Sequence, residues 1–179
     1  MLTTADGEAA FEDRNYEMAR EIWEPLADSG DAEAAAWLGS LYANGLGTEP
    51  DPARAFQLYR RAAEQGDALG QFNYAVVLTK GIGVTVDMTQ AVEWYRRAAQ
   101  GGHYPSQARL GYCYAKGLGT AVDRIEAFVW LSAAAQHGVG LAMAELEEVV
   151  RSMSEDERME GRRRLTGRLG SQNKTRLSA

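Results

Sequence analysis

The chain has one cysteine, Cys113, among its 179 residues, so no disulfide bond can form within it. It also lacks any uninterrupted apolar run that approaches the roughly 18 residues of a membrane-spanning helix, which excludes membrane insertion by such a helix. The segment from Met1 to Ala10 has neither the basic start nor the apolar run of a secretory signal. We therefore expect a cytoplasmic protein as the chain stands, or a periplasmic one if an export signal has been removed.

Basic residues are fewer than acidic ones, 19 against 25, and the formal net charge is −6. A chain of this charge lacks the basic field that a phosphate backbone requires, so we do not expect it to bind nucleic acid. Positions 1–50 carry two basic and eleven acidic residues, whereas positions 158–179 carry seven basic residues and one acidic residue. The basic end could attract an anionic surface, or it could be a solvated and partly disordered tail. Its residues include Arg162, Arg163, Arg164, Arg168, Lys174 and Arg176.

Several residue types recur with a spacing of 36 through most of the chain, and 45% of all residues are apolar, as in a globular protein. Glycine and aspartate form the clearest columns of this repeat. The columns are Gly30, Gly66, Gly102 and Gly138; Gly45, Gly81 and Gly117; Gly47, Gly83 and Gly119; and Asp51, Asp87 and Asp123.

Each period predicts two helices. The apolar positions between Asp67 and Lys80 fall on one side at about 100° per residue, which is typical of an amphipathic helix with Asp67 as its N-cap. A second helix is expected to begin at the aspartate column and to end at the column of Gly66, where glycine can turn left-handed. The paired glycines, as in Gly81-Ile-Gly83, join the two helices. They are interpreted as turns, because a phosphate-binding loop would follow a strand and lead to a lysine.

One such hairpin cannot bury its apolar face alone, so consecutive hairpins must stack. The sequence therefore predicts an all-α fold, a right-handed α-solenoid (superhelix) of helix-turn-helix repeats with a 36-residue period. Small residues at Gly39, Ala75 and Gly111 would let neighbouring helices approach closely. Aromatic residues would fill the remaining core, namely Tyr59, Trp94, Tyr95 and Trp130.

These segments resemble the Sel-one-like repeat (SLR) family, a branch of the tetratricopeptide-like superhelical class. The resemblance rests on Tyr59-Arg-Arg-Ala-Ala-Glu-Gln-Gly66, on Leu110-Gly-Tyr-Cys-Tyr114 and on Gly117-Leu-Gly119, and it covers roughly residues 5–152. It implies a bacterial protein with a concave groove where extended peptides or partner helices dock. The first unit departs from the pattern, with Ala9 and Phe11 in place of the glycine pair, and the last has Leu146-Glu147 in place of Leu-Gly. Both departures are read as caps.

After the last repeat, Ser154-Glu-Asp-Glu157 has the pattern of a capping box, which predicts a final helix from about Glu155 to Leu165. The apolar side chains of Met159 and Leu165 would close the solenoid. We expect a single solenoid domain over residues 1–167, with an N-terminal cap at about 4–29, repeats at about 30–65, 66–101 and 102–137, a C-terminal cap at 138–167, and a flexible basic tail at 168–179.

No set of catalytic or metal-binding residues stands out from the repeat, so we expect no enzyme, no cofactor and no metal. His103 occupies a helix-capping column and His137 precedes a helix-ending glycine, so a two-histidine metal site is disfavoured. Cys113 shares a column with Leu41 and Val77 and is interpreted as a buried small hydrophobe.

The expected function is a scaffold or adaptor that binds a peptide or helix of another protein. Carried over from the resemblance, the groove comprises Trp37, Ser40, Asn44, Phe72, Asn73, Val76, Thr79, Lys80, Arg109, Tyr112 and Lys116. An alternative is a regulatory module that self-associates weakly, head to tail, through its acidic start and basic end. A third hypothesis is an enzyme whose site combines Glu145, Glu148 and Arg109.

Overall fold

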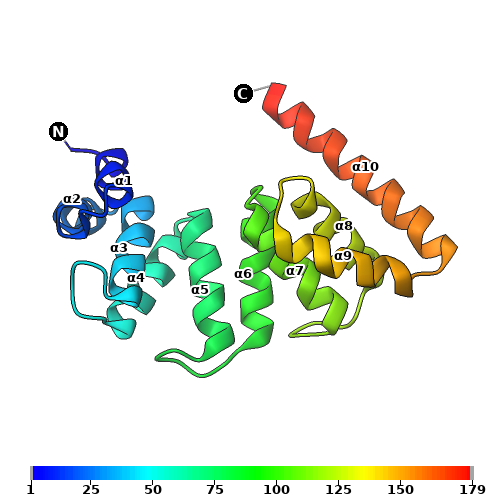
Figure 1. The fold of residues 1–179 in the computed structure, drawn as a ribbon, viewed down its shortest axis with the longest axis horizontal. Coiled ribbons are helices and arrows are strands. Elements are labelled where there is room, and N and C mark those ends of the chain that lie inside the picture. Colours follow the sequence, from blue (N-terminus) through cyan, green and yellow to red (C-terminus); the bar gives the residue numbers. More distant parts are fainter. Residues whose placement is uncertain (1, 178–179) are drawn as a thin grey trace. The chain divides into compact units, whose positions relative to one another are not determined.

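The computed structural model describes residues 2–177 of the chain. Within these residues it contains ten α-helices and no strand, which confirms the predicted all-α class (Figure 1). The helices belong to two compact units. The first unit extends to Gly101 and holds α1 to α6, and the second begins at Gly102 and holds α7 to α10.

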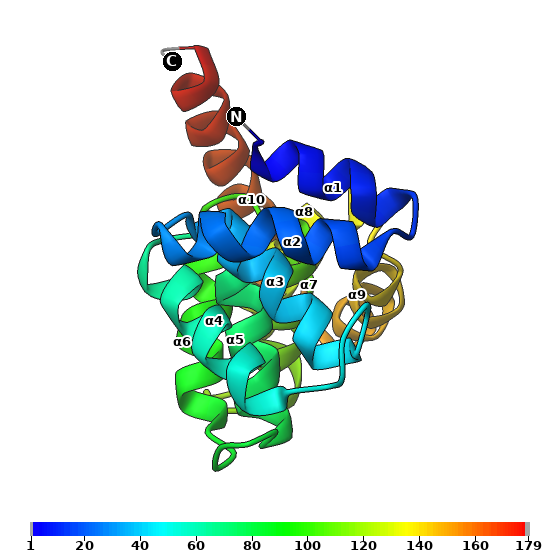
Figure 2. The same cartoon turned by 90° about the vertical axis from the view of Figure 1, so that its left-hand side faces the viewer.

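The first unit is a stack of three helical hairpins. We call the first helix of each hairpin helix A and the second helix B. The two helices of each hairpin pack together, and within this unit the first two B helices also pack against the helix A that follows them (Figure 2). The helices are α1 (Thr4–Glu12), α2 (Tyr16–Asp28), α3 (Ala32–Asn44), α4 (Pro52–Glu64), α5 (Ala68–Lys80) and α6 (Met88–Gln100).

The second unit continues the same scheme with one hairpin and two further helices. Helix A is α7 (Tyr104–Lys116) and helix B is α8 (Arg124–Ala135). The next helix A, α9 (Gly140–Ser152), packs against both of them, and α10 (Glu155–Leu177) packs against α8. Repeated hairpins of this kind define an all-α solenoid, as the 36-residue period predicted.

Aspartate side chains begin the helices where the repeat predicts them. Asp67 Oδ1 accepts a hydrogen bond from the backbone N–H of Gly70 at 2.6 Å, and Asp87 Oδ1 accepts one from Gln90 N at 2.8 Å. Such N-caps satisfy a donor that has no partner within the helix. At α7 the aspartate is replaced by His103, whose Nδ1 lies 2.8 Å from Ser106 Oγ and which makes no side-chain hydrogen bond to the helix backbone.

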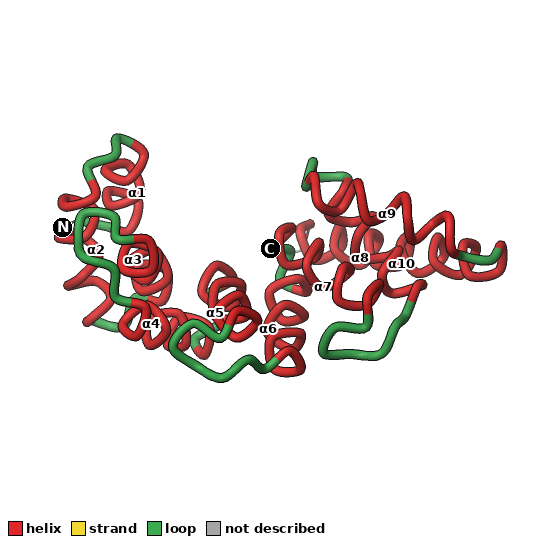
Figure 3. Tube along the Cα trace, turned by 60° about the horizontal axis from the view of Figure 1, so that its bottom comes forward, coloured by secondary structure: helices red, strands yellow, loops and turns green. Residues whose placement is uncertain are grey.

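The paired-glycine loops are turns that close on the preceding helix. At Gly81 the φ angle is +67° and at Gly83 it is +70°, values that an L side chain rarely adopts. Asp87 N then donates to Leu78 O at 3.1 Å, so the residue that caps α6 is also tied to the last turns of α5. Figure 3 shows these loops as the long green connections between helix A and helix B.

Close helix contacts in the core occur at the small residues, as predicted. A Cβ built on Gly39 would lie 2.8 Å from Tyr59 Cε1, and one on Gly111 would lie 2.7 Å from Leu131 Cγ. Among the expected core aromatics, Tyr59, Tyr95 and Trp130 are buried. Trp94 is half-buried, packs edge-on against Tyr74 and carries the guanidinium of Arg97 over its ring, so it lies at the border of the core.

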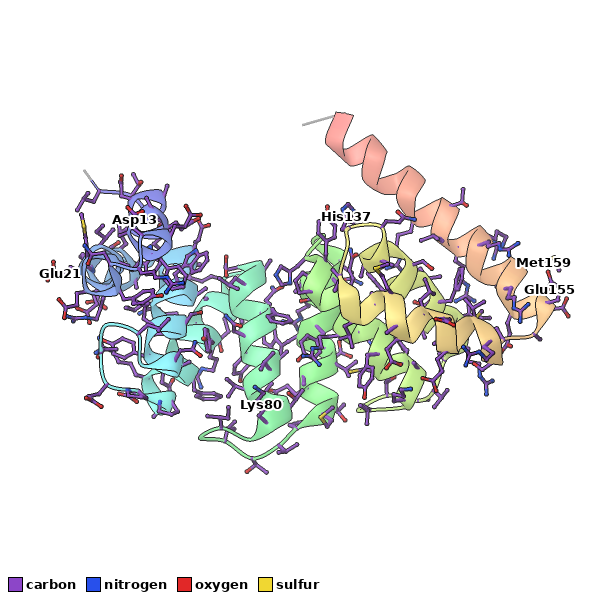
Figure 4. The ribbon with its side chains drawn as sticks, viewed as in Figure 1. Asp13, Glu21, Lys80, His137, Glu155 and Met159 are labelled. Atoms are coloured by element: carbon purple, nitrogen blue, oxygen red, sulfur yellow. The ribbon has the colours of Figure 1, made fainter. Side chains whose placement is uncertain are left out.

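Helix α10 begins as predicted but continues further. Ser154 and Glu157 form the capping box, with Ser154 N donating to Glu157 Oε2 at 2.7 Å and Glu157 N donating to Ser154 Oγ at 3.2 Å. The helix then runs to Leu177 rather than ending near Leu165. Met159 does not close the core as expected, because its side chain is 55% exposed (Figure 4).

The mobility predicted for the tail stays a prediction. Most of that tail lies outside what the structure describes, namely the side chains of residues 169–177, among them Lys174 and Arg176, together with residues 178 and 179.

Candidate partner-binding surface

Helices α3 and α5 carry the predicted groove residues of the first unit. Helix α3 packs against α5, whereas the B helices of this unit, all within the described residues, are not close neighbours of one another. In a curved stack the helices on the inner side lie closer together. The outward-facing residues of α3 and α5 lie on the side of this unit where two A helices pack together.

Trp37 has a structural role on this surface. Its ring stacks on Trp23 with 5.5 Å between centroids and 12° between planes, and it lies 5.5 Å from the ring of Phe11. This aromatic cluster joins α1, α2 and α3. Trp37 is half-buried, so only part of its side chain is open to a partner.

Ser40 joins three helices beside this cluster. Its Oγ accepts hydrogen bonds from the Tyr59 hydroxyl at 3.2 Å and from Asn73 Nδ2 at 3.4 Å. Asn44 Nδ2 in turn donates to Ser40 O at 2.8 Å. Among residues 2–168, whose side chains the structure describes, the side-chain carbonyl of Asn73 has no hydrogen-bond partner, which leaves it open to a backbone N–H of a bound peptide.

The exposed row of α5 combines apolar and polar side chains. Phe72 packs at 5.9 Å from the ring of Tyr95, which holds it in place, and Val76 is half-buried one turn further along. Thr79 Oγ1 donates to Val76 O at 2.8 Å. Lys80 is exposed at the end of the helix (Figure 4). This row offers apolar contact area next to a positive charge.

The three candidates of the second unit lie on α7, and one of them is already engaged. Lys116 Nζ lies 3.1 Å from Glu145 Oε2 and 3.0 Å from Glu148 Oε2, both on α9. Hydrogen bonds to Glu148 and Glu145 raise the pKa of the Lys116 ammonium. Tyr112 is half-buried with its ring 5.9 Å from this ammonium, and Arg109 is exposed. Glu145 and Glu148, offered as a catalytic pair, therefore hold Lys116 in an ion-pair cluster.

None of the eleven candidate residues is buried. Eight belong to α3 and α5 of the first unit and three to α7 of the second, so they form two patches. We call these the α3/α5 patch and the α7 patch. Sequence reasoning missed the link from Lys116 to α9, because the repeat pattern along each helix contains no distance between α7 and α9.

The cysteine and the histidines have packing roles. Burial raises the pKa of the Cys113 thiol to about 11, as expected for a small core hydrophobe. Burial lowers the pKa of His103. The ring of His137 stacks on that of Tyr104, with 3.5 Å between centroids. Among the described residues, no group of three or more His, Cys, Asp or Glu side chains could hold a metal ion.

The helical solenoid and its A-layer surface define this protein as a helical-repeat protein. Comparison with family models identifies four copies of the Sel1 repeat, at residues 6–31, 32–67, 68–103 and 105–139. The chain therefore belongs to the Sel1 repeat family. Members of this family are generally protein-interaction scaffolds and are typically non-catalytic. The first match, at residues 6–31, covers the segment that was expected to be the N-terminal cap.

Solved structures agree with this assignment. A Sel1 repeat protein from Oxalobacter formigenes is 35% identical, with a TM-score of 0.73 over 80% of this chain and 59% of that chain. The protective antigen c5321 of uropathogenic Escherichia coli, which has an SLR fold, is 29% identical, with a TM-score of 0.79 over 86% of this chain and 33% of that one. Cysteine-rich protein B of Helicobacter pylori is 20% identical with a TM-score of 0.54, over 80% of this chain and 97% of that chain, and shares the fold.

The chain thus spans less than two thirds of the length of the first two of these proteins. A comparison with curated proteins found no match. Among residues 2–177, no helix combines the length and the apolar character needed to cross a bilayer.

Proposed function

We propose that this protein is an adaptor that binds an extended or helical segment of a partner protein on its A helices. The α3/α5 patch supports this proposal most directly. Phe72 and Val76 offer apolar contact on the concave side of the first unit, and Asn73 and Lys80 offer polar contacts next to them. The helices that carry these side chains are fixed by the stack, so binding costs little conformational entropy on the adaptor side.

The α7 patch contributes a second set of contacts to the proposal. Arg109 is exposed and has no ion-pair partner among the side chains that the structure describes, so its guanidinium is open to a partner carboxylate. Lys116 is held by α9 and contributes less. Tyr112 supplies apolar area with a hydroxyl group, a combination common at interfaces.

Site-specific photo-crosslinking in the native cell tests which face binds. A benzophenone side chain at Lys80 should crosslink the partner, which mass spectrometry then identifies. The matched control carries the same group at Gln57, an exposed residue of α4 in the B layer of the same unit. Crosslinking at Gln57 but not at Lys80 would refute the A-layer assignment.

The identified partner then allows a binding measurement. Replacing Phe72 and Tyr112 with Ala should weaken binding by about tenfold or more, since truncation of an interface aromatic commonly costs over about 1 kcal/mol. Circular dichroism checks that the helical content is unchanged. Equal affinity of the double variant and the wild type would argue against both patches.

A further inference from the structure

The second unit has an open groove of about 530 Å³ between α8, α9 and α10, away from the residues proposed above. Phe128 and Ala135 of α8 and Leu146 and Val150 of α9 form its apolar floor, and Arg158 and Arg162 of α10 line its edge. This volume lies within the range of about 300–1,000 Å³ that is common for ligand sites.

The floor of this groove is buried in the other repeats. Leu146 belongs to the same column of the 36-residue repeat as Leu38, Tyr74 and Leu110. Those three side chains are 1%, 7% and 0% exposed, and the helix A that carries each of them packs against helix B of its own hairpin. Leu146 is only partly buried and lines the groove. The groove therefore lies where a helix B covers helix A elsewhere in the chain.

The neighbouring column leads to the same conclusion. At Gly39 and Gly111 helix B comes so close that a Cβ would not fit. A Cβ on Gly39 would collide with Tyr59, and one on Gly111 would collide with Leu131. Glu147 occupies this column in α9, and its side chain is 77% exposed. No helix of the described chain packs on α9 at this position.

Helix α10 does not fill the gap because it is fixed to α8. Gly161 lies against Phe128, where a Cβ would come within 2.6 Å of the ring. Arg164 Nη1 lies 2.9 Å from Glu126 Oε1, and the guanidinium of Arg168 lies 3.7 Å from the ring centroid of Trp130. These contacts hold α10 on α8 and leave the groove open along α9.

The charge at the edge of the groove indicates what could bind there. Arg162 is exposed, and its guanidinium has no hydrogen-bond or ion-pair partner among the described residues. Arg158 Nε donates a hydrogen bond to Val150 O at 3.2 Å. Its Nη1 lies 3.7 Å from Glu155 Oε2, which is a long distance for an ion pair. By contrast, the next two arginines, Arg163 and Arg164, both pair with Glu160 at 2.7 Å. The groove thus combines an apolar floor with one unpaired and one weakly paired guanidinium.

We propose that this groove binds an acidic amphipathic segment of a partner protein. Bulky apolar side chains of that segment would lie over Leu146 and Val150, and an Asp or Glu of the same segment would pair with Arg162 and Arg158. Guanidinium–carboxylate pairs are often bidentate, which fixes the orientation of the bound chain. The site is separate from the α3/α5 and α7 patches and does not depend on them.

A displayed library of 12-residue peptides, panned against the full chain, tests the proposal. Enriched peptides are synthesised with a fluorescent label, and their Kd is measured by anisotropy against four proteins. These are the wild type, Arg162→Glu, Gln136→Trp and the control Arg163→Ala. Gln136 is an exposed residue lining the groove, so a Trp at this position would fill the groove without changing its charge. Arg163 lies next to Arg162 on α10 but does not line the groove.

We expect enriched peptides with a bulky apolar residue three or four positions from an Asp or Glu. Their Kd should rise at least tenfold with Arg162→Glu and with Gln136→Trp, and it should stay within twofold with Arg163→Ala. The proposal is overturned if enrichment selects basic peptides, if no peptide is enriched, or if Gln136→Trp leaves the Kd unchanged.

Competition with oleate tests whether the groove is a fatty-acid site, and the variant Phe72→Ala tests whether the peptides bind on the A helices instead. Oleate that displaces the dye-labelled peptides with micromolar affinity would identify the groove as a fatty-acid site and overturn the proposal. If the Kd of the peptides rises with Phe72→Ala but not with Arg162→Glu, the result would support binding on the A helices and contradict binding in this groove.

Discussion

At the scale of single residues, one column of the repeat shows how the neighbouring helix gives a residue its role. Gly39 and Gly111 are small because Tyr59 and Leu131 of the adjacent helix B lie against them. Ala75 in the same column is fully buried. Glu147 is tolerated because no helix of the described chain packs on it. The same position is therefore a close-packing site in three repeats and a surface site in the fourth.

Replacing Gly111 with Ala should destabilise the protein by about 1–3 kcal/mol, the usual cost of overpacking a dense core. The new Cβ would lie 2.7 Å from Leu131 Cγ and 3.0 Å from Leu131 N, and the backbone cannot easily move away. Urea unfolding followed by circular dichroism measures the change. Gly140→Ala is the matched control, because a Cβ built on Gly140 meets no heavy atom within 4 Å. This substitution should leave the free energy of unfolding unchanged or raise it slightly. Equal effects of the two substitutions would contradict the packing argument.

At the scale of helices, starts are set locally and ends depend partly on tertiary contacts. Each aspartate of the repeat columns caps the helix that follows it, because its carboxylate reaches the N–H three residues on. The end of α10 has no such local signal. The helix does not end near Leu165 as expected, and Arg164 and Arg168 contact α8 on either side of that residue.

Asp87→Ala should therefore lower the free energy of unfolding by about 1 kcal/mol, the typical cost of losing an N-cap side chain. The lost interaction is the 2.8 Å hydrogen bond from Gln90 N to Asp87 Oδ1. Thr89→Ala, at an exposed position in the first turn of the same helix, should change stability by less than about 0.5 kcal/mol. Thermal and chemical unfolding of both variants measure the difference. A loss with Thr89→Ala as large as that with Asp87→Ala would argue against a specific capping role.

At the scale of the whole molecule, the uneven charge along the chain does not leave all of its basic residues free. Arg163 and Arg164 pair with Glu160, whose pKa these hydrogen bonds lower to about 2. Arg168 lies over the ring of Trp130. Fewer basic side chains of the second unit are therefore available for head-to-tail association than the number of basic residues in the sequence indicates.

We accordingly expect a monomer of 19.6 kDa at both low and high salt. Multi-angle light scattering at about 20 mM and about 500 mM NaCl measures the mass, since this change shortens the screening length several-fold. A larger mass at low salt that falls at high salt would support self-association between the acidic and basic ends instead.

Much of the candidate site followed from the repeat register, and the rest did not. The register placed Phe72, Asn73 and Val76 on one side of a helix, and none of them is buried. It could not show that Trp37 stacks on Trp23 or that Lys116 pairs with Glu145. These partners lie on other helices, and periodicity along one helix contains no distance to the next.

The sequence by itself determined the helices, their caps, the glycine turns and the stacking of hairpins, because each depends on residues within about one repeat of 36. Only the tertiary structure decided that α10 packs on α8 rather than on α9, and so left a basic-edged apolar groove. The physical reason is that this arrangement depends on contacts such as Gly161 with Phe128, which form only when distant segments meet.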